Sequence, residues 1–285
     1  MADLIQRESL ADAWVAAMEF LLDRGGKSFH LDVAFPAARY EPGSPPWEVI
    51  NEFLISHDKQ ELKTVVNTIF PEDLYSPDLG EEAAARLYEN YAMSMRVHQR
   101  TGRGNDQETY FNRLISYPVT VGGTDGLSKQ QRELLSDDGR FNQLDFYIDR
   151  LRRQRERGHR RSSYELGTTH FLDVDLRIQA PFRDKGIGSF PCLSHISLTL
   201  VDDHVNLNAT YRNQFLVERG FGNYVGLARL TEFIARESGA NAGEVQIVAT
   251  GADPELDNFK VSELRRLIAK CHESMGTKPK AVVNV

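Results

Sequence analysis

Residues 190–229 read F-P-C-L-S-H-I-S-L-T-L-V-D-D-H-V-N-L-N-A-T-Y-R-N-Q-F-L-V-E-R-G-F-G-N-Y-V-G-L-A-R. The run that follows Cys192 alternates apolar and polar residues, and so does the run that ends at Tyr211-Arg212, so both are expected to be strands. The pair Asp202-Asp203 between them predicts a turn. A glycine-rich turn that contains Asn223 comes next, and a helix follows it. The stretch therefore predicts two neighbouring strands, a turn and a helix in close succession.

Three side chains of this stretch would suit a nucleotide site. The thiol of Cys192 would attack a base, the guanidinium of Arg212 would hold a phosphate, and the amide of Asn223 would read a base edge. Each residue also has an ordinary structural interpretation. A lone cysteine in an apolar run usually fills the core, and its reactivity needs a nearby positive charge. Arg212 by itself is more often a surface or ion-pair residue, and Asn223 beside glycines is most simply a turn residue.

Helical and strand patterns alternate through the rest of the chain. Ser9 is a good capping residue for a helix with one apolar face, and two glycines end that helix. In the strand that follows, Phe29, Leu31, Val33 and Phe35 are expected to share one face. Further elements are expected as helices at 9–23, 47–55, 142–153, 226–239 and 261–270, as strands at 28–35, 243–250 and 280–285, and as a strand pair within 162–190. Periodicity alone thus predicts a soluble protein of the α plus β class.

Composition limits the class of protein. The 285 residues can form one substantial core, and 41% hydrophobic and 26% charged residues are ordinary for a soluble globular chain. The net charge of −7 argues against nucleic-acid binding, which usually requires a basic surface. Two distant cysteines form no disulfide framework, and no metal site is expected. Without a signal-peptide pattern or a membrane-length apolar run, we expect a cytoplasmic protein.

The order and spacing of Pro191-Cys192, Arg212 and Asn223 resemble those of the thymidylate synthase family, which includes pyrimidine nucleotide hydroxymethylases. The segment I-N-E-F-L, which contains Glu52, resembles the family segment that holds a catalytic glutamate. Tyr91, followed later by Arg96, resembles another family block. These segments occur in the family's order along most of the chain.

A basic stretch, residues 150–161, ends in Arg160-Arg161, which resembles the family's paired arginines. In the family, these arginines come from the neighbouring subunit and bind the substrate phosphate, for which a planar guanidinium is well suited. A solvated helix end and a surface that contacts nucleic acid are the other interpretations of the stretch, and the acidic net charge disfavours the second.

The resemblance implies a single domain over residues 1–285, with insertions around 100–140 and 165–188. It also implies a mixed β-sheet packed by helices and a homodimer formed through the sheet face. In the implied mechanism the thiolate of Cys192 adds to C6 of a pyrimidine nucleotide, so that C5 attacks a one-carbon unit from 5,10-methylenetetrahydrofolate. The implied roles are proton transfer by Glu52 and Tyr91, orientation of the pyrimidine by Asn223, phosphate binding by Arg212, Arg160 and Arg161, and further substrate contacts by Asn213 and Asp253.

The chain departs from the family mainly at its folate and sugar contacts. Phe70 replaces the Trp against the folate ring, and Phe215 replaces the Asp that holds the pterin. The family's Asp-x-His-x-Tyr, which binds the sugar, is replaced by residues 253–257, D-P-E-L-D. Methyl or hydroxymethyl transfer, to a ribo- or deoxyribonucleotide, remains open. A non-catalytic nucleotide sensor, a folate-independent enzyme and a structural dimer are the alternative functions.

Overall fold

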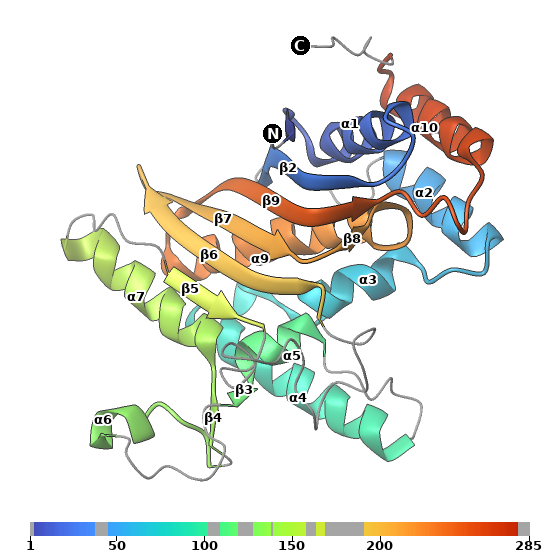
Figure 1. Ribbon diagram of the computed structural model, residues 1–285. Helices are drawn as coiled ribbons and strands as arrows, with labels where there is room; N and C mark the ends of the chain where they lie inside the picture. Colours follow the sequence, from blue (N-terminus) through green and yellow to red (C-terminus); the bar gives the residue numbers. More distant parts are fainter. Residues whose placement is uncertain are drawn as a thin grey trace.

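The computed structural model describes residues 3–37, 45–101, 109–118, 128–137, 139–157, 164–168 and 191–278. Within these residues an open mixed sheet is packed by helices, as Figure 1 shows. The mixed α/β architecture with a mixed sheet is therefore confirmed. The strand expected at 280–285 lies outside the described residues, as does most of the expected strand pair within 162–190.

The main sheet has seven strands, and its central strand is β9. Parallel pairs join β1 to β2, β7 to β9 and β8 to β9, whereas the other pairs are antiparallel. Along the sheet the order is β1 (Asp3–Gln6), β2 (Ser28–Pro36), β9 (Asn241–Asp253), β7 (His204–Tyr211), β6 (Leu193–Val201) and β5 (Tyr164–Gly167), with β8 (Gln214–Phe215) also beside β9. A second, two-stranded sheet pairs β3 (Tyr117–Pro118) with β4 (Arg140–Phe141).

Helices account for most of the remaining described chain. They are α1 (Leu10–Asp23), α2 (Pro45–Ser56), α3 (Leu62–Ile69), α4 (Ala83–Thr101), α5 (Tyr110–Ile115), α6 (Lys129–Arg132), α7 (Gln143–Arg157), α9 (Phe221–Ser238) and α10 (Val261–Met275). Two 3₁₀ turns, η2 (Glu72–Leu74) and η3 (Pro77–Glu82), precede α4, and a π-helical turn, η5 (Leu216–Gly220), precedes α9. The expected helix start at Ser9 is confirmed, because its side chain accepts a hydrogen bond from the backbone of Asp12 at 3.1 Å. No described helix has both the length and the apolar character needed to cross a membrane.

The predicted hairpin is present as β6 and β7. Asp202 and Asp203 form its turn with φ angles of 48° and 61°, the left-handed geometry that two-residue hairpin loops use. The predicted alternation is less regular in β2, where Phe29 is 73% exposed although the residue after next, Leu31, is buried. His30 has a φ of 61°, which interrupts the pleat between them. The prediction that Phe29 belongs to the buried face is therefore wrong.

Helix α9 forms the centre of the core beneath the sheet. All of its residues except Arg229, Glu232 and Arg236 are buried. A Cβ on Gly222 would lie 2.8 Å from the Cβ of Val65 in α3. The glycines near the start of α9 therefore permit close packing of two helices. The interpretation of Asn223 as a turn residue is wrong, because it lies in the first turn of α9.

The two faces of the sheet differ. One face packs on helices, and in Figure 1 α9 runs behind the sheet while no described helix crosses in front of β6, β7 and β9. Side chains on the open face are only half-buried and mostly polar: Ser197, Thr199, Asn206, Asn208, Thr210, Glu244, Gln246 and Val248. Cys192 lies at the end of this sheet, immediately before β6.

Candidate functional site

The two cysteines have different environments. Cys271 in α10 is completely buried, and burial alone raises the pKa of its thiol to about 12. Cys192 is only half-buried and packs against the edge of the core. The core-filling interpretation therefore applies to Cys271, whereas Cys192 is buried only in part.

Arg212 lies directly beside Cys192. Its backbone N–H donates to the carbonyl of Cys192 at 2.9 Å, and its Nε donates to the carbonyl of Pro191 at 3.2 Å. Burial raises the pKa of Cys192 above its ordinary value, while Arg212 and then Arg219 act to lower it. The resulting pKa is raised, so the thiol is protonated at neutral pH in the ligand-free chain.

Tyr110 anchors the segment that carries the thiol. Its hydroxyl accepts hydrogen bonds from the backbone N–H groups of Cys192 at 3.2 Å and Leu193 at 3.3 Å. The adjacent residue, Thr109, caps α5 and hydrogen-bonds the hydroxyl of Tyr91. Tyr91 is buried and its pKa is raised by burial. Tyr91 is therefore linked to the backbone of Cys192 through Thr109 and its neighbour Tyr110.

Asn223 and Asn213 lie on the two sides of η5. The side chain of Asn223 is 5% exposed and forms no hydrogen bond with any described residue. Asn213 follows Arg212 directly and is half-buried, with its Oδ1 against Gly251 of β9. Both amides thus lie on the segment that leads from Arg212 into α9.

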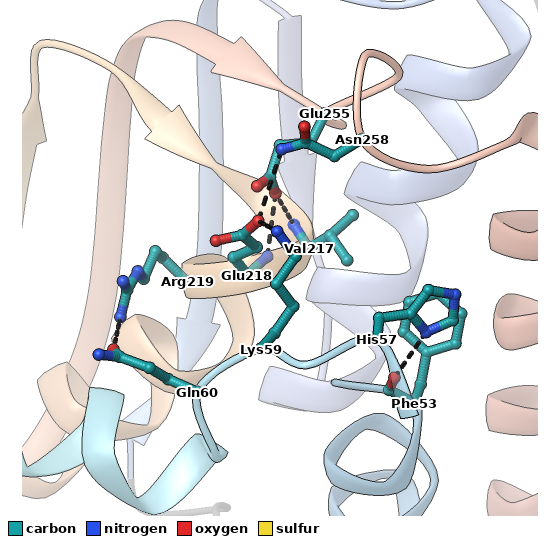
Figure 2. Close-up of polar contacts among 9 residues, drawn as sticks. All are labelled: Phe53, His57, Lys59, Gln60, Val217, Glu218, Arg219, Glu255 and Asn258. Atoms are coloured by element: carbon teal, nitrogen blue, oxygen red, sulfur yellow. Dashed lines mark hydrogen bonds and ion pairs between the residues drawn. The ribbon is translucent and has the colours of Figure 1, made fainter. Parts of the chain in front are cut away.

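Asp253 is occupied by contacts within the chain. Its Oδ1 accepts the backbone N–H of Glu255 at 2.8 Å, and its Oδ2 lies 3.0 Å from the Nζ of Lys27. Glu255 in turn accepts the backbone N–H groups of Val217 at 2.8 Å and Glu218 at 2.9 Å, as Figure 2 shows. Asp253 and Glu255 therefore anchor η5 to the end of β9.

Burial raises the pKa of Glu255 to about 7, against the opposing effect of its two backbone donors. The carboxylates of Glu218 and Asp253 raise it further. Glu255 occupies the third position of D-P-E-L-D, where the resemblance implies a sugar contact. In this chain the carboxyl group instead holds the turn that positions Arg219.

Glu52 does not lie in the Cys192 cluster. It is exposed and lines a groove of about 490 Å³ between α2 and α10, together with Glu263, Arg266 and Lys270. None of the residues that surround Cys192 lines this groove. The proton-transfer role that the resemblance implies for Glu52 would require it beside Cys192, whereas in the described structure its exposed side chain lies in the groove between α2 and α10.

In the described part of the basic stretch, two arginines of α7 bind the end of α9. In α7, Arg152 donates through Nε to the carbonyl of Glu237 at 2.5 Å. Arg155 donates through Nη1 to the carbonyl of Ser238 at 3.4 Å and pairs with Asp203 at 2.5 Å. These arginines therefore satisfy carbonyls at the end of α9, where positive charge is favourable. Arg160 and Arg161 lie outside the described residues.

Local sequence pattern does not reveal that three further residues belong to the site. Tyr110 bonds a backbone group 82 positions away, and Arg219 bonds Gln60 across 159 positions. Glu255 reaches Val217 across 38 positions. Only the positions of Cys192 and Arg212 at the base of one hairpin could be anticipated from local pattern.

Comparisons with known proteins add no functional evidence for this chain. No protein-family model matches it, and no curated protein matches it. Within the described residues, no group of three or more His, Cys, Asp or Glu side chains could hold a metal ion. The geometry around Cys192 is therefore the basis of the functional argument.

Proposed function

We propose that this protein is a pyrimidine nucleotide-binding enzyme that uses Cys192 as its nucleophile. The binding of Arg212 to the Pro191-Cys192 segment, through its backbone N–H and its Nε, beside half-buried Cys192 is the observation that carries the proposal. A guanidinium in this position stabilises the thiolate and also provides donors for a phosphate. Asn223, in the first turn of α9, would orient the base, because an amide both donates and accepts hydrogen bonds.

The proposed chemistry is covalent. The Cys192 thiolate adds to C6 of a uridine-type nucleotide, which makes C5 a nucleophile that attacks an electrophilic one-carbon donor at the oxidation level of formaldehyde, and C5 then loses its proton to a base. Addition of water to the transferred carbon gives a hydroxymethyl group, whereas a methyl group requires a hydride donor as a further co-substrate. Tyr110 holds the backbone of the nucleophile, and Tyr91 supports Tyr110 through Thr109. Loss of the C6–S bond would then release the product and restore the thiol.

The proposed carbon donor, 5,10-methylenetetrahydrofolate, is less well supported by the residues present. Phe70 is 2% exposed, and its ring already packs on Phe111, Phe233 and Tyr75 with centroids 5.2–6.0 Å apart. It has no free face for a folate ring. Phe215 is 41% exposed and offers no side-chain hydrogen bond to a pterin. These residues do not fit the implied folate contacts, so no step is assigned to folate here.

We further propose a thymidylate-synthase-like fold that dimerises through the open sheet face. The half-buried polar side chains of that face support pairing with a second polar surface, and Asn208 and Gln246 already bond each other there at 3.1 Å. In such a dimer the partner subunit would supply Arg160 and Arg161 to the phosphate. Sedimentation or light scattering would test the dimer directly.

A non-catalytic nucleotide sensor is the second candidate function. Two observations favour it: the pKa of Cys192 is raised overall, and Glu52 lies in a different groove. A sensor would use Arg212 and Asn223 to bind the nucleotide without forming a bond to sulfur.

Mass spectrometry of a covalent adduct separates the two functions. The protein would be incubated with 5-fluoro-dUMP or its ribo form, with and without methylenetetrahydrofolate. The enzyme function predicts an adduct in the wild type and in Cys271→Ala, and none in Cys192→Ala. Nucleotide binding without an adduct would support the sensor. The absence of both binding and adduct would refute both candidates.

A further inference from the structure

Gln214 carries a buried amide that has no hydrogen-bond partner among the described residues. The residue is 1% exposed, and both its Oε1 and its Nε2 are buried without a partner. A polar group that is removed from water without compensation destabilises the folded chain, so nearly all such groups in folded proteins are bonded. Gln214 therefore presents an acceptor and two donors that no described residue uses.

Gln143 shows how this chain satisfies another buried amide. The residue is 5% exposed, and its Nε2 donates to the carbonyls of Arg113 at 3.2 Å and Gly167 at 2.9 Å. Its Oε1 accepts the backbone N–H of Gly167 at 2.9 Å. The amide of Gln143 thus joins α7 to α5 and β5. Gln214 has the same side chain and greater burial but none of these contacts, so a structural role of this kind does not account for it.

Gln214 lies close to Cys192 through the chain that joins them. It belongs to β8, which pairs with the end of β9 (Figure 1), and it follows Arg212 by two residues. The backbone N–H of Arg212 donates to the carbonyl of Cys192 at 2.9 Å. Bonded neighbours across strands have Cα atoms about 5.5 Å apart and two residues span at most about 7 Å, so the Cα atoms of Gln214 and Cys192 are within about 13 Å. A Gln side chain and a pyrimidine ring together can bridge this distance.

The hydroxyl of Tyr211 is a second buried polar group of this corner without a partner among the described residues. Tyr211 is completely buried and lies opposite Leu193, the residue after Cys192, in the pairing of β6 with β7. Burial raises the pKa of Tyr211, and the charges of Tyr110 and Cys192 raise it further, in agreement with this position. Unpartnered polar groups thus lie on both sides of Arg212 in the chain, at positions 211 and 214.

We propose that the amide of Gln214 recognises the base of the ligand that reaches Cys192, through paired hydrogen bonds to one edge of a uracil ring. That edge carries an N–H beside a carbonyl oxygen, so the amide accepts a hydrogen bond from the first and donates one to the second. The proposal rests on the nucleotide function proposed above and deepens it, because it names a residue that selects the base. Arg212 then holds the phosphate of the same ligand.

Thermal unfolding of Gln214→Met tests the buried amide without any ligand. Met has nearly the shape of Gln but lacks the amide, so loss of the unpaired polar atoms should raise the melting temperature by about 2–4 °C. The matched control is Gln143→Met, which removes an amide with three hydrogen bonds and should lower the melting temperature. A lower melting temperature for Gln214→Met would show that its amide is already satisfied in the folded chain, for example by water, and would overturn the proposal.

Calorimetry with UMP and ribose 5-phosphate tests recognition of the base. Both probes carry the sugar phosphate, but only UMP carries the ring. The wild type should bind UMP at least about tenfold tighter than ribose 5-phosphate, and Gln214→Met should lose most of this preference without a change in its affinity for ribose 5-phosphate. UMP methylated at N3, which lacks the N–H of the edge, should bind the wild type about as weakly as UMP binds Gln214→Met.

The results separate this proposal from the nucleotide function. If the wild type prefers UMP and Gln214→Met keeps the full preference, base recognition by Gln214 is refuted while the nucleotide function stands. If the wild type binds UMP and its N3-methylated form equally well, the paired hydrogen bonds are refuted in the same way. If the wild type binds neither UMP nor ribose 5-phosphate, the nucleotide function itself fails, and recognition of a base by Gln214 fails with it.

Discussion

Replacement of Glu255 by Gln should stabilise the protein above neutral pH. The carboxyl group is 4% exposed and its pKa is raised from 4.5 to about 7, first by burial. Because the folded state binds this proton more tightly than the unfolded state, the associated stability is complete below about pH 4.5 and is lost as pH rises through about 7. The two pKa values differ by an amount that corresponds to about 3 kcal/mol.

Gln reproduces the protonated form of Glu255 in shape and charge, and its carbonyl can still accept the N–H groups of Val217 and Glu218. We therefore expect Glu255→Gln to match the wild type near pH 5 and to exceed its unfolding free energy by up to about 3 kcal/mol near pH 8.5. Glu255→Ala would remove the partner of both N–H groups, and the loss at the buried N–H of Val217 alone costs about 1–3 kcal/mol at every pH.

Urea unfolding followed by circular dichroism from about pH 5 to about pH 8.5 provides the assay. Other titrating groups, including the histidines, cancel in the difference between variant and wild type. Glu263→Gln is the control, because Glu263 also accepts a backbone N–H, at 3.1 Å from Lys260, but at an exposed helix start. The change in unfolding free energy of this control variant should be about 1 kcal/mol. If the unfolding free energies of the wild type and Glu255→Gln changed in parallel with pH, this account of the buried carboxyl group would be refuted.

Two further predictions concern helix packing and the thiol. Gly226→Ala places a Cβ 2.9 Å from the Cβ of Ile69, so α9 and α3 must separate. Urea unfolding should show that the unfolding free energy falls by about 1–3 kcal/mol. Unchanged stability would contradict the close packing described above. Arg212→Gln removes a charge that lowers the pKa of Cys192, so the pH profile of iodoacetamide alkylation should move to higher pH. A profile identical to that of the wild type would show that Arg212 does not act on the thiol.

Local pattern was sufficient for the elements whose causes are local. Ser9 begins α1 because its side chain accepts a backbone N–H of the first turn, and Gly239 ends α9 with a φ of 74° that favours glycine. The α9 start was predicted less well, because Gly222 permits contact with Val65, 157 positions earlier (222 − 65), and no local signal reports such a contact.

The candidate site shows the same division. Glu52 belongs to a helix that was predicted correctly, but the direction of its side chain depends on how α2 packs against α10. Tyr110, Arg219 and Glu255 joined the site only through contacts between distant segments. Spacing alone contains no information about which segments meet, since that depends on the packing of the whole core.

The hairpin shows most clearly which features follow from the sequence and which are decided by the tertiary structure. From the sequence alone, the aspartate pair places Cys192 ten residues before Asp202 and Arg212 nine residues after Asp203 (202 − 192 and 212 − 203), so both are expected at the open end of one hairpin, and the distance between their side chains is left to the tertiary structure. Regular pairing would set Leu193 opposite Arg212. An irregularity between Leu193 and His195 shifts the register by one residue, and Arg212 bonds Cys192 instead. Only the tertiary structure shows this shift: the bulge disrupts the ladder locally, and the backbone N–H groups of Cys192 and Leu193 bond the hydroxyl of Tyr110, which is distant in the sequence.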